Sequence, residues 1–112
     1  MMQRPFQGSA DFAAIMALAV QAPVEQFSAT ALPYQLSSWA SDDPANIGLW
    51  EDGQGRLMAF AIFQVPFASL YYTTHPAIDT TAFLPTVLTW GNVRAAAVAR
   101  ERGTPFTFSV FA

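Results

Sequence analysis

Residues 46–65 read NIGLWEDGQGRLMAFAIFQV, and this stretch decides the fold. Its centre, residues 52–55, holds the residues that form tight turns, so a strand over 46–51 is predicted to turn back into a strand over 56–65. Both alternating sets of side chains in the second strand are apolar. We therefore expect this strand to lie inside a sheet that is covered on both faces. The two sets are Leu57, Ala59, Ala61, Phe63 and Val65 on one face, and Met58, Phe60 and Ile62 on the other.

Further elements are predicted on both sides of this hairpin. Residues 2–6 form a short first strand, and the Ser9 hydroxyl caps a helix whose apolar side chains recur at helical spacing as far as Pro23. Residues 24–43 form either a second, shorter helix or a loop. Residues 67–74 are rich in aromatic and β-branched side chains, which favours a third antiparallel strand.

The longest predicted helix covers residues 81–102. Thr80 or Thr81 can cap its start, and Gly103 is suited to end it. A last strand is predicted over residues 104–111. The resulting order predicts an α+β fold, in which a mixed, mainly antiparallel sheet has helices on both faces. The side chains expected at the contact between the sheet and the long helix are Phe60, Ile62, Leu88 and Val98.

Composition excludes several classes of function. The chain has 112 residues, which predicts a single domain over residues 1–112. It has no Cys, no Lys and one His, which excludes thiolate nucleophiles, cysteine zinc sites, Schiff-base lysines and multi-histidine metal sites, so no metal site is predicted. A net charge of -3 argues against nucleic acid as a partner. No apolar run is long enough to span a membrane, and the run over 13–20 follows Asp11 directly, which disfavours a signal peptide and predicts a cytoplasmic protein.

Several phrases of the chain resemble the N-terminal part of a GCN5-related N-acetyltransferase (GNAT) domain, and more narrowly the first domain of bacterial tandem-domain members. The resemblance implies a partial GNAT-like order, β-α-(α)-β-β-β-α-β, that lacks a further helix and two strands after the fifth strand. The phrases are Arg4-Pro5-Phe6, residues 46–53 running into residues 57–60, Thr74-His75-Pro76, Leu88-Thr89-Trp90-Gly91, and residues 106–111.

The chain departs from the resembled family at the cofactor loop. In that family a glycine-containing loop before the long helix holds the pyrophosphate of acetyl-CoA through backbone N–H groups. Here the corresponding stretch, His75 to Phe83, has no glycine. Pro76 lacks an N–H group and Asp79 would repel phosphate, and Thr80 and Thr81 complete a loop without the usual motif. The tyrosine that acts as general acid in the family comes from the region after the fifth strand, so it is assigned to no residue here.

These departures leave three functions open. The first is an acetyltransferase-like domain that is degenerate in acetyl-CoA binding and acts as an association or substrate-shaping module. The second is a functional acetyl-CoA-dependent N-acetyltransferase. The third is a small-ligand binding protein with an aromatic cleft.

Two residues are weak candidates for a catalytic base. His75 ends a strand, and an unperturbed imidazole is able to serve as a base near neutral pH, although a ring that bonds a backbone group is the favoured interpretation. Glu51 stands beside a turn, where carboxylates are usually solvated. A structural role is favoured for both.

The last predicted strand is also a candidate interface. It is rich in Phe, and the low charge content leaves few side chains to protect its edge. We therefore expect a dimer or larger homo-oligomer that pairs through this strand. The residues expected to lose exposed surface there are Phe106, Phe108, Val110 and Phe111.

Overall fold

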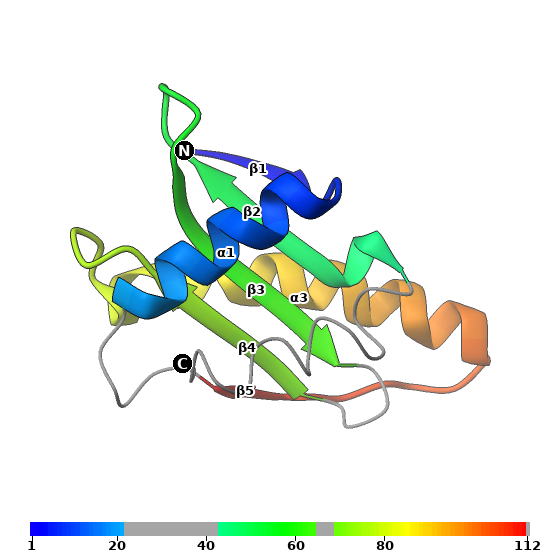
Figure 1. The fold of residues 1–112 in the computed structure, drawn as a ribbon. Coiled ribbons are helices and arrows are strands. Elements are labelled where there is room, and N and C mark those ends of the chain that lie inside the picture. The colour runs from blue at the N-terminus through cyan, green and yellow to red at the C-terminus, as the bar shows by residue number, and fades with distance from the viewer. Residues whose placement is uncertain (22–42, 65–68, 112) are drawn as a thin grey trace.

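The computed structural model describes residues 1–21, 43–64 and 69–111. The expected helix or loop over 24–43 lies outside the described residues, as do Val65 and Phe67 at the ends of two expected strands. Figure 1 shows the elements, which follow one another as β1 (Met2–Pro5), α1 (Ser9–Gln21), the short 3-10 helix η1 (Pro44–Asn46), β2 (Ile47–Glu51), β3 (Leu57–Gln64), β4 (Ser69–Thr74), α3 (Thr80–Arg102) and β5 (Ser109–Phe111).

The strands form one five-stranded sheet in the order β1-β2-β3-β4-β5. The first three neighbouring pairs are antiparallel, whereas β4 and β5 are parallel because α3 connects them across one face. The predicted α+β class, with a mixed and mainly antiparallel sheet, is confirmed. None of the helices in the described residues combines the length and the apolar character that a membrane span requires.

Strand β3 lies at the centre of the sheet and is covered on both faces, as its two apolar sets predict. Figure 1 shows α1 in front of the sheet and α3 behind it. Phe60 and Ile62 pack with Ile15 and Leu18 of α1 in one hydrophobic cluster. The alternate side chains of β3 pack on the opposite face with α3 in a second cluster, which includes Ala59, Ala61, Phe63, Phe83, Val87 and Ala95.

The predicted contact between the sheet and the long helix is correct only for Val98, which is buried on α3. Phe60 and Ile62 are buried, but against α1, because alternate residues of a strand point to opposite faces. Leu88 is only partly buried, and its neighbour Val87 faces the sheet instead. Leu88 therefore lies at the edge of the buried stripe of α3, which consists of Phe83, Val87, Gly91, Ala95 and Val98.

Asp79 caps the start of α3, so the prediction that Thr80 or Thr81 caps it is wrong. The Asp79 Oδ1 atom accepts hydrogen bonds from the backbone N–H groups of Thr81, at 2.9 Å, and Ala82, at 3.2 Å. Both threonines lie inside the first turn, where a hydroxyl cannot replace the cap. Gly103 ends the helix as predicted, with a left-handed backbone (φ 71°) and an N–H bond to the Ala99 carbonyl.

Candidate functional site

The loop from His75 to Asp79 joins the end of β4 to the start of α3, at the position where the resemblance implies a cofactor loop. The backbone N–H of His75 donates to the Met58 carbonyl of β3 at 2.7 Å, which anchors the loop to the sheet. The N–H of Ile78 then donates to the His75 carbonyl at 2.8 Å, which closes a tight turn. The loop is thus held at both its first and its fourth residue.

The N–H groups of Ala77 and Ile78 donate to acceptors within the loop, and three N–H groups in the first turn of α3 donate to Asp79. The N–H of Ala77 donates to His75 Nδ1 at 3.0 Å, and that of Phe83 donates to the Asp79 carbonyl at 3.0 Å. Thr81 and Ala82 donate to the Asp79 carboxylate, as described above. The carboxylate therefore lies at the positive end of the α3 dipole, where an anion would otherwise bind.

Two side chains of β4 form hydrogen bonds to the first turn of α3. The Tyr72 hydroxyl donates to the Thr80 carbonyl at 3.1 Å, and the hydroxyls of Thr74 and Thr80 are 2.9 Å apart. Burial raises the pKa of Tyr72 above its ordinary value. Thr73, on the other face of β4, is fully buried, and its hydroxyl has no hydrogen-bond partner among the described residues.

The His75 ring stabilises this loop by accepting a hydrogen bond from the Ala77 backbone. Because its Nδ1 accepts the Ala77 N–H, a neutral ring carries its proton on Nε2. The ring borders a cavity of about 400 Å³ on the α1 side, together with Arg56, Met58 and Ala77. Among the described residues, no group of three His, Asp or Glu side chains is placed to hold a metal ion.

Glu51 belongs to a different cluster, which sequence reasoning missed. Arg4 of β1 donates through Nε to Glu51 at 2.8 Å, and through its two terminal nitrogens to Asp11 of α1 at 2.7 and 2.6 Å. The hydrogen bond from Arg4 lowers the pKa of Asp11. The cluster joins β1, α1 and β2. The sequence signal for this cluster is weak. It consists of an acidic residue, Asp11, in the first turn of a helix, and an arginine, Arg4, in the strand before that helix.

The structure does not bring the two catalytic candidates together. Strands β2 and β4 lie on opposite sides of β3, so the backbones that carry Glu51 and His75 are two strand spacings apart, about 10 Å. Glu51 is bound by Arg4, and the His75 Nδ1 lone pair is used by Ala77. Glu51 and His75 therefore take part in two different sets of contacts and do not form one site.

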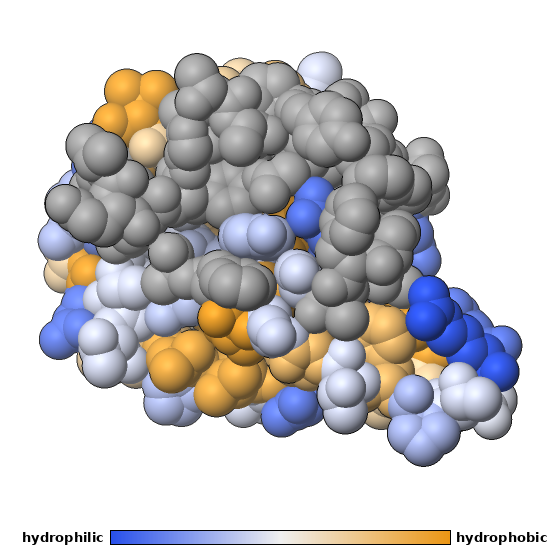
Figure 2. Space-filling view, turned by 90° about the horizontal axis from the view of Figure 1, so that it is seen from below, coloured by the Kyte–Doolittle hydropathy of each residue, from blue (hydrophilic) through white to orange (hydrophobic). Residues whose placement is uncertain are grey.

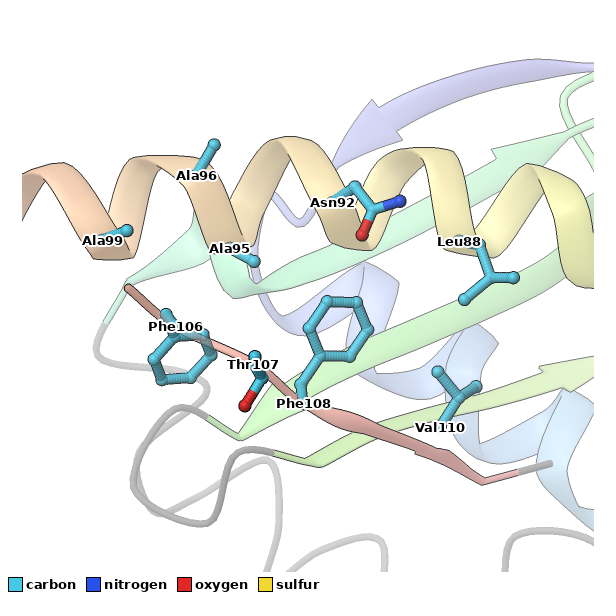
Figure 3. A pocket seen from close by; sticks show the side chains of 9 residues that line it. All are labelled: Leu88, Asn92, Ala95, Ala96, Ala99, Phe106, Thr107, Phe108 and Val110. Atoms are coloured by element: carbon cyan, nitrogen blue, oxygen red, sulfur yellow. The ribbon is translucent and has the colours of Figure 1, made fainter. Parts of the chain in front are cut away.

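A second feature is an apolar groove between α3 and the last segment of the chain, which we call the α3–β5 groove. Figure 2 shows hydrophobic residues gathered along this side of the molecule. The groove has a volume of about 510 Å³. Figure 3 shows the residues that line it, which are Leu88, Asn92, Ala95, Ala96, Ala99, Phe106, Thr107, Phe108 and Val110.

The floor of the groove comes from alternate residues of the last segment. Phe106, Phe108 and Val110 are partly buried beneath α3, whereas Thr107 and Ser109 are exposed. The strand covers only Ser109–Phe111 and not the predicted residues 104–111, and it pairs with Ser69, Leu70 and Tyr71 of β4. The side chain of Phe111 lies outside the described residues. The rings of Phe106 and Phe108 contact Phe63 of β3, with centroids 5.7 and 5.1 Å from its own.

The topology can be compared with known proteins. No protein-family model matches the sequence, and a comparison with curated proteins found no match. The crystal structure of a GCN5-related N-acetyltransferase from Sphaerobacter thermophilus matches with a TM-score of 0.66, over 93% of this chain and 34% of that one.

The chain has the fold of the GCN5-related N-acetyltransferases. The sequence identity is 20%, so the likeness is one of fold, and this chain spans about a third of the length of the Sphaerobacter protein. The predicted fold resemblance is confirmed. The loop before α3 therefore lies in an acetyltransferase-like framework.

Proposed function

We propose that this acetyltransferase-like domain is degenerate in acetyl-CoA binding and acts as an association or substrate-shaping module. One observation carries the proposal. The Asp79 carboxylate takes up the first backbone N–H groups of α3, which are the donors that a phosphate would need.

The electrostatics of the loop support this proposal. A pyrophosphate at the start of α3 would have to displace the Asp79 carboxylate and remain close to its negative charge. Losing the cap costs about 0.5–2 kcal/mol before any charge repulsion is added. Pro76 offers no N–H group, and Ala77 is already bonded to the His75 ring. The residues present therefore do not fit the pyrophosphate of acetyl-CoA.

The candidate bases also support a role without acyl transfer. A general base needs a free lone pair within hydrogen-bond reach of the substrate. The Glu51 Oε1 atom accepts a hydrogen bond from Arg4, and the Nδ1 atom of His75 accepts a hydrogen bond from the Ala77 backbone N–H. In a working N-acetyltransferase, the alternative, the His75 Nδ1 atom could act as a base only after it released the Ala77 N–H.

Calorimetric titration of the full chain with acetyl-CoA tests the proposal. We expect no binding at up to about 1 mM ligand, whereas a micromolar Kd would overturn the proposal. Acetyl transfer to a panel of amines should likewise remain at the uncatalysed rate.

Two variants at position 79 test whether the Asp79 carboxylate is the group that prevents acetyl-CoA from binding. Asp79→Asn removes the charge but keeps a side-chain oxygen for the two N–H groups, whereas Asp79→Gly leaves those groups free at little cost to the cap. We expect Asp79→Gly to bind acetyl-CoA more tightly than Asp79→Asn. Equal, undetectable binding in both variants would show that Asp79 is not the blocking group.

A further inference from the structure

We propose that the cavity of about 400 Å³ beside the His75 ring binds a small carboxylate that carries an apolar body. We call it the His75 cavity. The proposal goes beyond the function proposed above, because binding there would not require acetyl-CoA. The position of the cavity, its hydrogen-bond donors and its apolar lining support the proposal. The described residues that line it are Gln21, Arg56, Leu57, Met58, His75 and Ala77.

The His75 cavity lies where three segments of the chain meet. It is lined by the last residue of α1, by the start of β3 and by the loop that joins β4 to α3. Figure 1 shows the end of α1 beside that loop. The loop is fixed, because the His75 N–H donates to the Met58 carbonyl at 2.7 Å and the His75 ring accepts the Ala77 N–H at 3.0 Å. A ligand would therefore meet walls that the fold already holds in place, in a volume within the range of small-molecule sites.

Two side chains supply hydrogen-bond donors at this cavity. The Arg56 guanidinium donates through Nε to Asp52 at 2.8 Å, and its two terminal nitrogens have no partner among the described residues. In a neutral His75 ring the proton lies on Nε2, and this N–H has no acceptor in the described part of the chain. A guanidinium and a second N–H donor match the two oxygens of a carboxylate, and such charged hydrogen bonds are stronger than neutral ones.

The Asp52 carboxylate orients Arg56 without occupying the cavity. Its Oδ1 atom accepts the backbone N–H groups of Gln54, at 2.8 Å, and Arg56, at 3.0 Å, and its Oδ2 atom accepts Arg56 Nε. Three donors therefore already compensate its negative charge. None of the described residues that line the cavity is acidic, so an anion there would meet no carboxylate in the lining.

The rest of the lining is largely apolar. Leu57 and Met58 are half-buried, whereas the Arg56 side chain keeps 72% of its exposure, so the charge lies at the rim and the apolar surface lies deeper. A ligand with an apolar body would cover Leu57 and Met58 while its carboxylate stays beside Arg56. Because a phosphate ion would leave that apolar surface in water, the lining favours an aliphatic or aromatic carboxylate.

Titration of the untagged full chain with 3-phenylpropanoate tests the proposal, and its neutral amide and inorganic phosphate are the control probes. His75 is the only histidine of the chain, so the NMR signals of its ring report on this cavity. At constant pH we expect the carboxylate to shift these signals saturably, with a Kd of about 1 mM or below, and each control to bind at least about tenfold more weakly. No saturable shift at up to about 10 mM carboxylate, or equal binding of either control, would overturn the proposal.

A matched pair of variants locates the site. Arg56→Gln removes the guanidinium from the cavity, whereas Arg100→Gln makes the same change at an exposed position in the last turn of α3, about 30 Å along the helix from the loop. We expect Arg56→Gln to raise the Kd for 3-phenylpropanoate at least about tenfold and Arg100→Gln to leave it within about twofold. Circular dichroism should show both variants folded.

Equal losses of affinity in the two variants would indicate a diffuse effect of net charge and would overturn the proposal. The outcome is separate from the acetyl-CoA titration. A chain that binds both 3-phenylpropanoate and acetyl-CoA overturns only the degenerate cofactor site, whereas a chain that binds neither overturns only the carboxylate site.

Discussion

Arg4 is the side chain that ties the first strand to the rest of the molecule. Its guanidinium spans Asp11 of α1 and Glu51 of β2, two elements that lie 40 residues apart in the chain. The side chains of Arg4 and Asp11 keep only 27% and 10% of their exposure. Planar bidentate pairs of this kind are among the stronger charged contacts in proteins, because two hydrogen bonds form at once.

Asp11 should therefore make stability depend on pH. The hydrogen bond from Arg4 lowers the pKa of Asp11 in the folded state below its ordinary value of 3.8, so the unfolded chain takes up the proton first as pH falls. The contribution is fully present well above pH 3.8 and is lost as the pH falls through the folded-state pKa. Urea unfolding at several pH values should show this loss.

The matched variant is Asp11→Asn. We expect it to lower the free energy of unfolding at pH 7 by about 1–3 kcal/mol, because it weakens a charged hydrogen bond. It should also flatten the acid limb of the pH profile. An acid limb as steep as that of the wild type would mean that other carboxylates cause it.

Helix α3 lies close to the sheet because two glycines leave room for it. A Cβ atom at Gly48 of β2 would lie 2.7 Å from Trp90 Cε2, and one at Gly91 of α3 would lie 2.8 Å from Leu70 Cδ2. The rings of Trp50 and Trp90 meet edge to face beside this contact, with centroids 5.9 Å apart. The close approach brings α3 onto β2, β3 and β4 together.

Substitution of Gly48 by Ala should loosen this contact between elements. The added methyl group must displace the Trp90 ring, and overpacking of a core typically costs about 1–3 kcal/mol. Urea unfolding followed by tryptophan fluorescence measures the loss. Gly53→Ala is the control, because a Cβ there meets no atom within 4 Å. Similar losses from both substitutions would contradict the steric explanation.

The whole molecule is organised as two cores that share β3. Phe60 and Phe63 are both fully buried, but Phe60 belongs to the cluster under α1 and Phe63 to the aromatic cluster under α3. The sheet separates the two clusters. The α1 cluster and the α3 cluster are therefore expected to respond independently to substitution.

Phe60→Leu and Phe63→Leu test this independence. Each should cost about 1–2 kcal/mol, less than the 3–5 kcal/mol typical of Phe→Ala, because Leu fills part of the space. The double variant should lose the sum of the two within about 0.5 kcal/mol, as distant sites do. Chemical denaturation of all four proteins gives the comparison. A coupling energy well above that range would mean that the two cores form one unit.

The α3–β5 groove also depends on the arrangement of the whole molecule. Its walls come from α3 and from the last segment, which meet only because β5 returns beside β4. The sequence indicated an apolar last strand but not the helix face that would stand above it. The groove therefore follows from topology.

Local chemistry by itself determined much of this fold. The turn over residues 52–55, the two-sided strand that follows it, the long helix and its end at Gly103 were all predicted, because each depends on residues only a few positions apart. The resemblance to the acetyltransferases also came from the order of such elements.

Only the tertiary structure decided how the faces meet. It turned Val87 and not Leu88 towards the sheet, and it set Phe60 and Ile62 against α1. The Arg4 cluster joins β1, α1 and β2. The physical reason is common to all of these features. Each is settled by contacts between elements that are distant in the chain, and a side chain's local pattern does not contain the neighbour that will pack against it.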